Sequence, residues 1–112
     1  MAATEYVQVL TTASSEGEAE AISAALLERR LAACVQVAGP VRSRYRWQGE
    51  VETAEEWQCV AKTTAAALPR VEEALRELHS YDEPEIVAVA ILAGSAGYLD
   101  WIGANVGARN PA

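Results

Sequence analysis

The strongest constraint in this sequence is a strict two-residue alternation that ends at a glycine turn. One side of the alternation consists of Val41, Ser43, Tyr45 and Trp47, and the other of Arg42, Arg44 and Arg46. A period of two is that of a β-strand, in which successive side chains point to opposite faces. Gln48-Gly49 follows directly, and glycine readily adopts the positive φ that a tight hairpin turn requires. The pattern therefore predicts one long β-hairpin over residues 41–63.

The rest of the chain alternates between strand-like and helix-like stretches. Strands are predicted over residues 6–10, 33–37 and 85–91, and helices over 15–31, 69–78 and, shorter, after residue 95. This order, βαββαβ with a short C-terminal helix, is that of a ferredoxin-like α+β sandwich. Right-handed crossovers place both long helices on one face of an antiparallel sheet. We expect residues 1–112 to form one domain, with a frayed tail over 107–112.

The charge of the chain argues against two classes of partner. With 16 acidic and 9 basic residues the formal net charge is −7, which repels nucleic acid phosphates and anionic lipid headgroups. No apolar run approaches the roughly 20 residues of a membrane-spanning helix, and the first ten residues lack the basic segment of a signal peptide. We therefore expect a cytoplasmic protein that binds neither nucleic acid nor membrane. In that compartment Cys34 and Cys59 are expected to stay reduced and buried.

One side of the predicted hairpin is too apolar for permanent contact with water. Tyr45 and Trp47 belong to it, and Trp57 continues an apolar alternation with Cys59 and Ala61 on the return strand. The hairpin is also longer than typical strands, so its edges should project past the helices and invite pairing with another chain. We therefore predict that Tyr45, Trp47 and Trp57 lie in a subunit interface. This pattern is compatible both with a dimer and with a closed ring of three.

Five short stretches carry a further signal through their order and spacing. They are LAACV at residues 31–35, YRWQGE at 45–50, KT at 62–63, HSYDEPEI at 79–86 and YLDW at 98–101. Together they resemble the CutA family of divalent-cation tolerance proteins, although each alone is weak. The resemblance implies a homotrimer shaped like the PII-type signalling proteins and a role in tolerance of copper and other divalent cations. It also implies a ligand cleft between subunits that is lined by Trp47, Lys62, Tyr81 and Glu85.

The single histidine, His79, is the candidate metal ligand, with Asp82 and Glu83 beside it. Imidazole nitrogens and carboxylate oxygens both bind divalent metals, so this segment is the candidate site for copper or another divalent cation. The alternative is structural, because a histidine here suits the carboxyl end of the second long helix. Some CutA members carry a cysteine at the end of the first strand and a second histidine beside this one. Here those places hold Thr11 and Leu78.

Three functions are compatible with these features. The first is a cation-responsive binding protein in copper tolerance. The second is a PII-like assembly module that binds a small anion or a protein partner at its subunit clefts. In that module the ammonium group of Lys62 would donate to the anion. The third is a hydrolase with Cys34 as nucleophile and His79 as base, but a thiol buried in a strand is inert. Since the sequence also lacks a P-loop, a dinucleotide fingerprint and a Ser-His-Asp spacing, we expect no enzyme activity and no catalytic residues.

Overall fold

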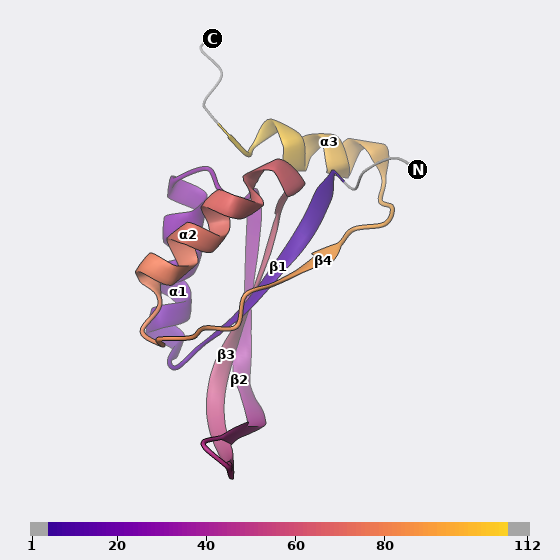
Figure 1. Ribbon diagram of the computed structural model, residues 1–112. Coiled ribbons are helices and arrows are strands. Elements are labelled where there is room, and N and C mark those ends of the chain that lie inside the picture. Colours follow the sequence, from indigo (N-terminus) through magenta and orange to yellow (C-terminus); the bar gives the residue numbers. More distant parts are fainter. Residues whose placement is uncertain (1–4, 108–112) are drawn as a thin grey trace.

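Four strands form one antiparallel sheet, and two helices cover one of its faces (Figure 1). In the computed structural model, which describes residues 5–107, the elements are β1 (Tyr6–Ala13), α1 (Glu16–Glu28), β2 (Cys34–Trp47), β3 (Glu50–Thr64), the 3-10 helix η1 (Ala65–Ala67), α2 (Leu68–Leu78), β4 (Val87–Ala90) and α3 (Ala96–Ala104). The strands lie in the order β2-β3-β1-β4. The predicted α+β class is confirmed. The predicted tail, apart from Gly107, lies outside the described residues.

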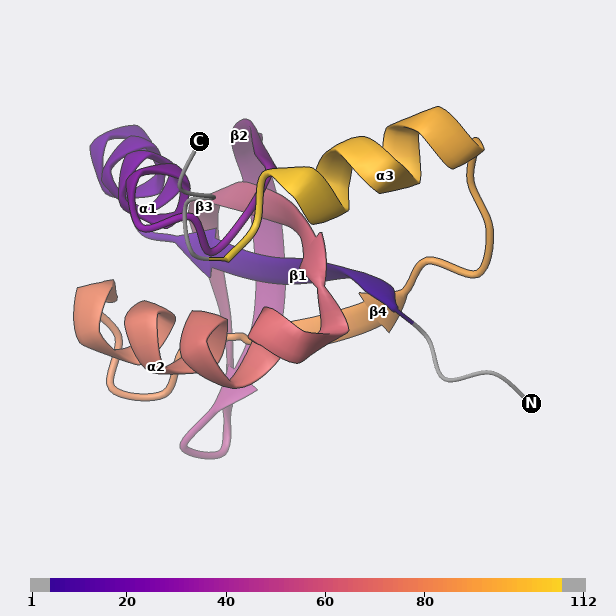
Figure 2. The same cartoon turned by 90° about the horizontal axis from the view of Figure 1, so that it is seen from above.

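The hydrophobic core lies between the sheet and the pair α1 and α2, which Figure 2 shows side by side. Helix α1 buries Ala19, Ile22 and Leu26, the residues that share one face of a helix at spacings of three and four. The strands contribute alternate residues to the same core, because successive side chains point to opposite faces. No helix between residues 5 and 107 has the length and apolarity that crossing a bilayer requires.

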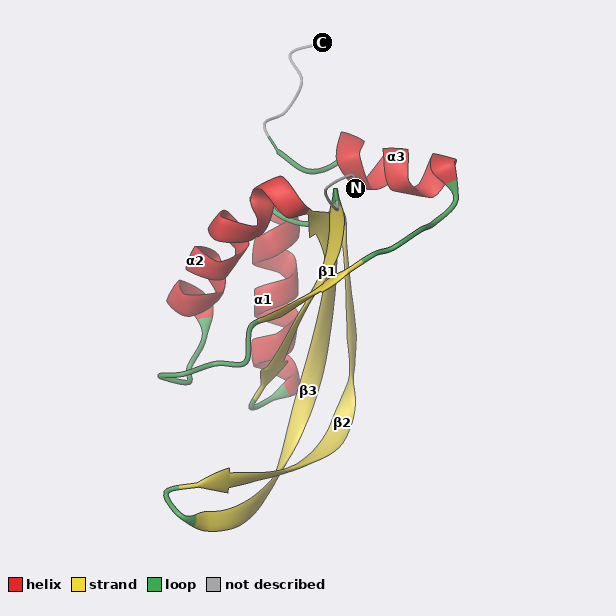
Figure 3. Cartoon of the chain, turned by 45° about the vertical axis from the view of Figure 1, so that its right-hand side comes forward, coloured by secondary structure: helices red, strands yellow, loops and turns green. Residues whose placement is uncertain are grey.

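The long hairpin is present and projects beyond the helical layer (Figures 1 and 3). Gln48 and Gly49 have φ of 51° and 82°, so both turn residues take the left-handed conformation of a tight hairpin turn. Trp47 pairs directly with Glu50 across this turn. The predicted hairpin and its turn are therefore confirmed.

A bulge in β2 changes which face of the sheet the hairpin residues occupy. The register shifts between Ala38 and Val41, where β2 holds one residue more than β3. Val37 pairs with Cys59 on the helical side, whereas Val41 pairs with Glu56, whose side chain is on the opposite side by alternation. Tyr45 and Trp47 follow Val41, so they lie on the face that the two long helices leave free.

Trp57 does not share that face. It pairs with Ala13 and packs against the core on the helical side. Its indole ring also covers Gly39 so closely that a Cβ at Gly39 would lie 2.5 Å from Trp57 Cδ1. For Tyr45, Trp47 and Trp57 the interface remains a prediction.

The first and last strands differ in length from the predictions. Strand β1 continues past the predicted end at residue 10 to Ala13, because threonine suits a pleated surface and Thr11 lies buried opposite Cys59. Strand β4 is only four residues long, since pairing with β1 is limited to Val87–Ala90. The segment before β4 is therefore a loop, and it borders the candidate site.

Candidate functional site

A groove of about 750 Å³ opens between the β2–β3 hairpin and the loop that joins α2 to β4. Its walls carry three aromatic rings, five carboxylates and one guanidinium: Tyr45, Trp47, Tyr81, Glu52, Glu56, Asp82, Glu83, Glu85 and Arg44. The excess of carboxylates makes the groove electronegative, and the low-dielectric aromatic walls strengthen that field. The groove therefore favours a positively charged ligand.

The structure brings part of the predicted ligand cleft together. Trp47, Tyr81 and Glu85 line the groove, whereas Lys62 does not. Lys62 lies under α3, where its Nζ is 3.3 Å from the hydroxyl of Tyr98. Within one chain the four residues predicted to line the cleft therefore do not lie together, because Lys62 is outside the groove.

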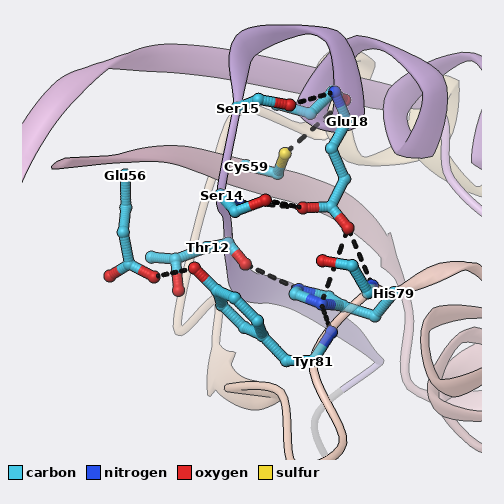
Figure 4. A network of polar contacts seen from close by, with 10 residues as sticks. Thr12, Ser14, Ser15, Glu18, Glu56, Cys59, His79 and Tyr81 are labelled. Carbon is cyan, nitrogen blue, oxygen red and sulfur yellow. Dashed lines mark hydrogen bonds and ion pairs between the residues drawn. The ribbon is translucent and has the colours of Figure 1, made fainter. Parts of the chain in front are cut away.

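The carboxylate of Glu18 binds the loop between α2 and β4, which forms one side of the groove (Figure 4). Ser15 caps α1, since its Oγ accepts a 3.1 Å hydrogen bond from the Glu18 backbone N–H. The carboxylate of Glu18 does not return to Ser15, as a capping box would have it. Instead it accepts hydrogen bonds from the backbone N–H and Oγ of Ser14 at 2.9 and 3.0 Å, and from the backbone N–H of Ser80 at 2.8 Å.

These hydrogen bonds favour the ionised form of Glu18. Partial burial acts in the opposite direction, but the bonds from Ser80 and Ser14 outweigh it and lower the pKa of Glu18 to about 2. Glu18 is therefore charged at every physiological pH. It holds the start of α1 and the loop after α2 in a fixed relation.

His79 is a structural residue in this arrangement. Its side chain is fully buried, and Nε2 lies 2.6 Å from the carbonyl oxygen of Thr12. Because a carbonyl only accepts, Nε2 carries the proton and Nδ1 is free to accept the Tyr81 backbone N–H at 3.2 Å. The histidine is also the C-cap of α2, where its backbone N–H bonds to Leu75. Both ring nitrogens are thus occupied by the protein itself.

The residues predicted to bind metal do not fit a His79-centred site. No nitrogen of His79 is available, and Glu83 extends to Arg76, with 3.6 Å between Oε2 and Nη1. Within residues 5–107, no three His, Cys, Asp or Glu side chains gather so that they could share one ion. Asp82 and Glu83 do line the groove. Their contribution is therefore to the charge of the groove, not to a histidine-based metal centre.

Glu56 is the site residue that sequence reasoning missed. It is only 8% exposed, although it lines the groove. The hydroxyl of Tyr81 donates a 2.8 Å hydrogen bond to Glu56 Oε2 (Figure 4). Burial, together with this bond to a carboxylate, raises the pKa of Tyr81 well above its usual range. In the described part of the chain no cationic side chain pairs with Glu56.

Cys34, the predicted nucleophile, lies apart from His79. Cys34 pairs with Lys62 beside Gln8, whereas His79 contacts Thr12, four residues further along β1. Cys59 is buried, and burial together with the nearby carboxylates of α1 raises the pKa of its thiol to about 11. Neither thiol is placed with a base as a nucleophile would be.

Comparison with known proteins agrees with this fold along nearly the whole chain. The family model of the CutA1 divalent ion tolerance protein matches residues 7–105. The divalent-cation tolerance protein CutA of Thermus thermophilus is 48% identical over 99 residues, which are 88% of this chain and 96% of that protein.

Two solved structures are also similar to the chain. That of the divalent cation tolerance protein from Thermus thermophilus has a TM-score of 0.89 at 46% identity, covering 91% of this chain and 99% of that one. The structure of CutA from Xylella fastidiosa has a TM-score of 0.90 at 36% identity, covering 93% and 100%. The protein described here therefore belongs to the CutA1 divalent ion tolerance family.

Proposed function

We propose that this chain acts in divalent-cation tolerance as a cytoplasmic homotrimer that binds a cationic ligand in its groove and has no enzyme activity. Membership of the CutA1 family supports the physiological role. The carboxylate-rich groove supports a cation as the ligand. The separation of Cys34 from His79 supports a binding function over a catalytic one.

The observation that supports a cation as the ligand is the carboxylate of Glu56, a residue that is only 8% exposed and has no ion pair within residues 5–107. Removing a carboxylate from water is costly unless a cation or strong hydrogen bonds compensate for the lost hydration. Within residues 5–107, Glu56 receives one hydrogen bond, from Tyr81, and no ion pair. A cation in the groove would supply the missing partner.

The trimer is supported by apolar surface on the free side of the sheet. Tyr45 and Trp47 of the hairpin are 41% and 54% exposed, and Val87 and Val89 of β4 are about half exposed. Exposed apolar surface at two separate places suits a head-to-tail contact, in which one patch meets the other on a neighbouring copy. If every copy repeats this contact by the same rotation about one axis, three copies close into a ring.

The alternative module, which binds a small anion at the cleft, has less support. An anion in this groove would meet five carboxylates and a single arginine, Arg44. The predicted anion donor, Lys62, is bonded to Tyr98 outside the groove. A protein partner with a basic surface remains compatible with the same electronegative groove.

Calorimetric titration with Cu(II) and Zn(II) tests the proposal. We expect binding that Glu56→Gln weakens, because the amide keeps the hydrogen bond from Tyr81 but lacks the charge. Glu55→Gln is the matched control, since it removes the same charge from the neighbouring position on the other side of β3. Equal affinities of both variants would contradict the groove as the site. Binding that is lost only in His79→Gln would restore the histidine as a ligand.

A further inference from the structure

His79 is a buried ionisable residue that the proposed function does not use. Its side chain has no exposed surface, and its two ring nitrogens contact backbone groups of two different segments, the carbonyl of Thr12 and the N–H of Tyr81. We propose that His79 is a pH switch for the loop between α2 and β4, in which protonation of Nδ1 releases the backbone of Tyr81. The inference goes beyond the proposed function, since it does not depend on what the groove binds.

The observed hydrogen bonds of His79 require a neutral imidazole. Nε2 donates to the carbonyl oxygen of Thr12 at 2.6 Å, and Nδ1 accepts the backbone N–H of Tyr81 at 3.2 Å. An imidazolium carries a proton on both nitrogens and accepts no hydrogen bond. Protonation of Nδ1 therefore sets two N–H groups against each other, and the bond from Tyr81 breaks.

Glu18 provides a partner for the charged imidazole. Its Oε2 lies 4.0 Å from Nδ1 of His79 and accepts the backbone N–H of Ser80 at 2.8 Å. A carboxylate oxygen has two lone pairs, so Oε2 has room for a second donor. Because the pKa of Glu18 is about 2, a proton taken up from water at mildly acid pH goes to His79 and not to Glu18. Protonation thus exchanges the bond from Tyr81 for an ion pair with Glu18.

The other ionisable groups near the imidazole do not gain or lose charge in the range where histidine does. They belong to β3 and to the loop, whereas β1 presents the uncharged carbonyl of Thr12: Cys59, Glu56, Tyr81, Asp82 and Glu83. The pKa of the Cys59 thiol is raised to about 11, and that of Tyr81 well above its usual range, so both stay neutral. Carboxylates ordinarily change charge at lower pH than imidazoles. Between about pH 8 and pH 5 the change of charge is therefore that of His79.

Tyr81 connects this switch to the groove. Its backbone N–H is bonded to His79, and its hydroxyl donates to Glu56 Oε2 at 2.8 Å on the groove wall (Figure 4). A shift of the backbone moves the ring with it, so the bond to Glu56 loosens when the bond to Nδ1 breaks. Ser80 remains bonded to Glu18, which keeps the loop attached to α1. The groove wall is therefore fixed at neutral pH and movable at mildly acid pH.

Nuclear magnetic resonance of the full chain tests the switch without any ligand. His79 is the only histidine, so the ring signals of protein labelled with ¹⁵N-histidine report its protonation without ambiguity. We expect a neutral ring with the proton on Nε2 at about pH 8, and both nitrogens protonated at about pH 5. Over the same range the Tyr81 amide should exchange with solvent about tenfold faster, after correction for the intrinsic pH dependence, as the loss of one hydrogen bond implies.

Three variants separate the parts of the switch. Glu18→Gln should move the titration of the ring to lower pH, because the imidazolium loses its charged partner. Glu20→Gln, an exposed position on the same helix, is the matched control and should leave it unchanged. His79→Gln should abolish the acid response of the Tyr81 amide.

A ring that stays neutral down to about pH 5 overturns the proposal. So does a Tyr81 amide whose exchange is unaltered when the ring titrates, or an acid response of Tyr81 that persists in His79→Gln. Equal effects of Glu18→Gln and Glu20→Gln contradict Glu18 as the partner of the imidazolium. If His79→Gln fails to fold, the wild-type protein decides: coinciding midpoints for the ring and the Tyr81 amide support the switch, and separate midpoints overturn it.

Discussion

The backbone N–H of Ser80 donates a 2.8 Å hydrogen bond to the carboxylate of Glu18, which joins the first turn of α1 to the loop bordering the groove. The same carboxylate accepts two hydrogen bonds from Ser14 at the end of the β1–α1 connection. One side chain thus links two segments that are far apart in the sequence. Its ionisation state therefore controls how firmly the groove's loop is held.

Glu18→Gln should lower stability and flatten its acid dependence. The pKa of Glu18 in the folded protein is about 2, below the ordinary value of 4.5. A lowered folded-state pKa stabilises the fold above pH 4.5, and this stabilisation is lost as the pH falls towards 2. We expect the variant to lose about 2 kcal/mol of unfolding free energy at pH 7. Urea denaturation from pH 7 to pH 2 measures both effects.

Glu20→Gln is the matched control for that experiment, because Glu20 is exposed on the same helix. Its stability curve should follow that of the wild type. If the Glu18→Gln curve keeps the full wild-type slope between pH 4.5 and 2, the assignment of acid sensitivity to Glu18 is incorrect.

Thr11→Val should stabilise the protein. The Thr11 hydroxyl is buried among core residues and has no hydrogen-bond partner in the described structure. An unpaired buried hydroxyl costs free energy, and valine has nearly the same shape without it. We expect a gain of about 1 kcal/mol in unfolding free energy, measured by urea denaturation. A loss of stability would show that the hydroxyl has a partner, such as an ordered water.

Gly39→Ala should destabilise the hairpin, whereas Gly17→Ala should not. A Cβ at Gly39 would lie 2.5 Å from Trp57 Cδ1, so the indole ring must move out of its packed position. The expected cost is about 1–3 kcal/mol. A Cβ at Gly17 in α1 meets nothing, and alanine there should add about 0.5–1 kcal/mol. Thermal unfolding of both variants compares the two sites, and equal melting temperatures would contradict the packing argument.

Local patterns predicted the fold well because they act over short distances. The alternation before Gln48-Gly49 located the hairpin turn, and the order of strand-like and helix-like stretches predicted the α+β class. Local patterns could not predict which face of the sheet each side chain of the hairpin occupies. One extra residue between Ala38 and Val41 reverses every later side chain of β2, and only the pairing with β3 reveals it.

The site was less predictable, since it depends on contacts between distant segments. Trp47, Tyr81 and Glu85 were anticipated from the family resemblance, and they do meet in the groove. Glu56 has no distinguishing sequence feature, because its hydrogen bond with Tyr81, 25 positions away, forms only in the folded chain. For His79 the sequence left a metal ligand and a structural residue at the end of the helix as alternatives, and in the structure the carbonyl of Thr12 occupies its Nε2. That contact exists only because β1 continues past the predicted end of the strand.

We predict that the protein assembles as a homotrimer. Light scattering coupled to size exclusion should give about 36 kDa, three times the 12.0 kDa of one chain. Trp47→Glu should reduce this mass at micromolar concentration, because it places a charge on an exposed aromatic position of the hairpin. Leu27→Glu is the control, since Leu27 is 44% exposed on α1, away from the hairpin. A wild-type mass near that of one or two chains would exclude the trimer. An unchanged mass for Trp47→Glu would instead exclude Trp47 from the interface, and the exposed valines of β4 would then be the surface to test.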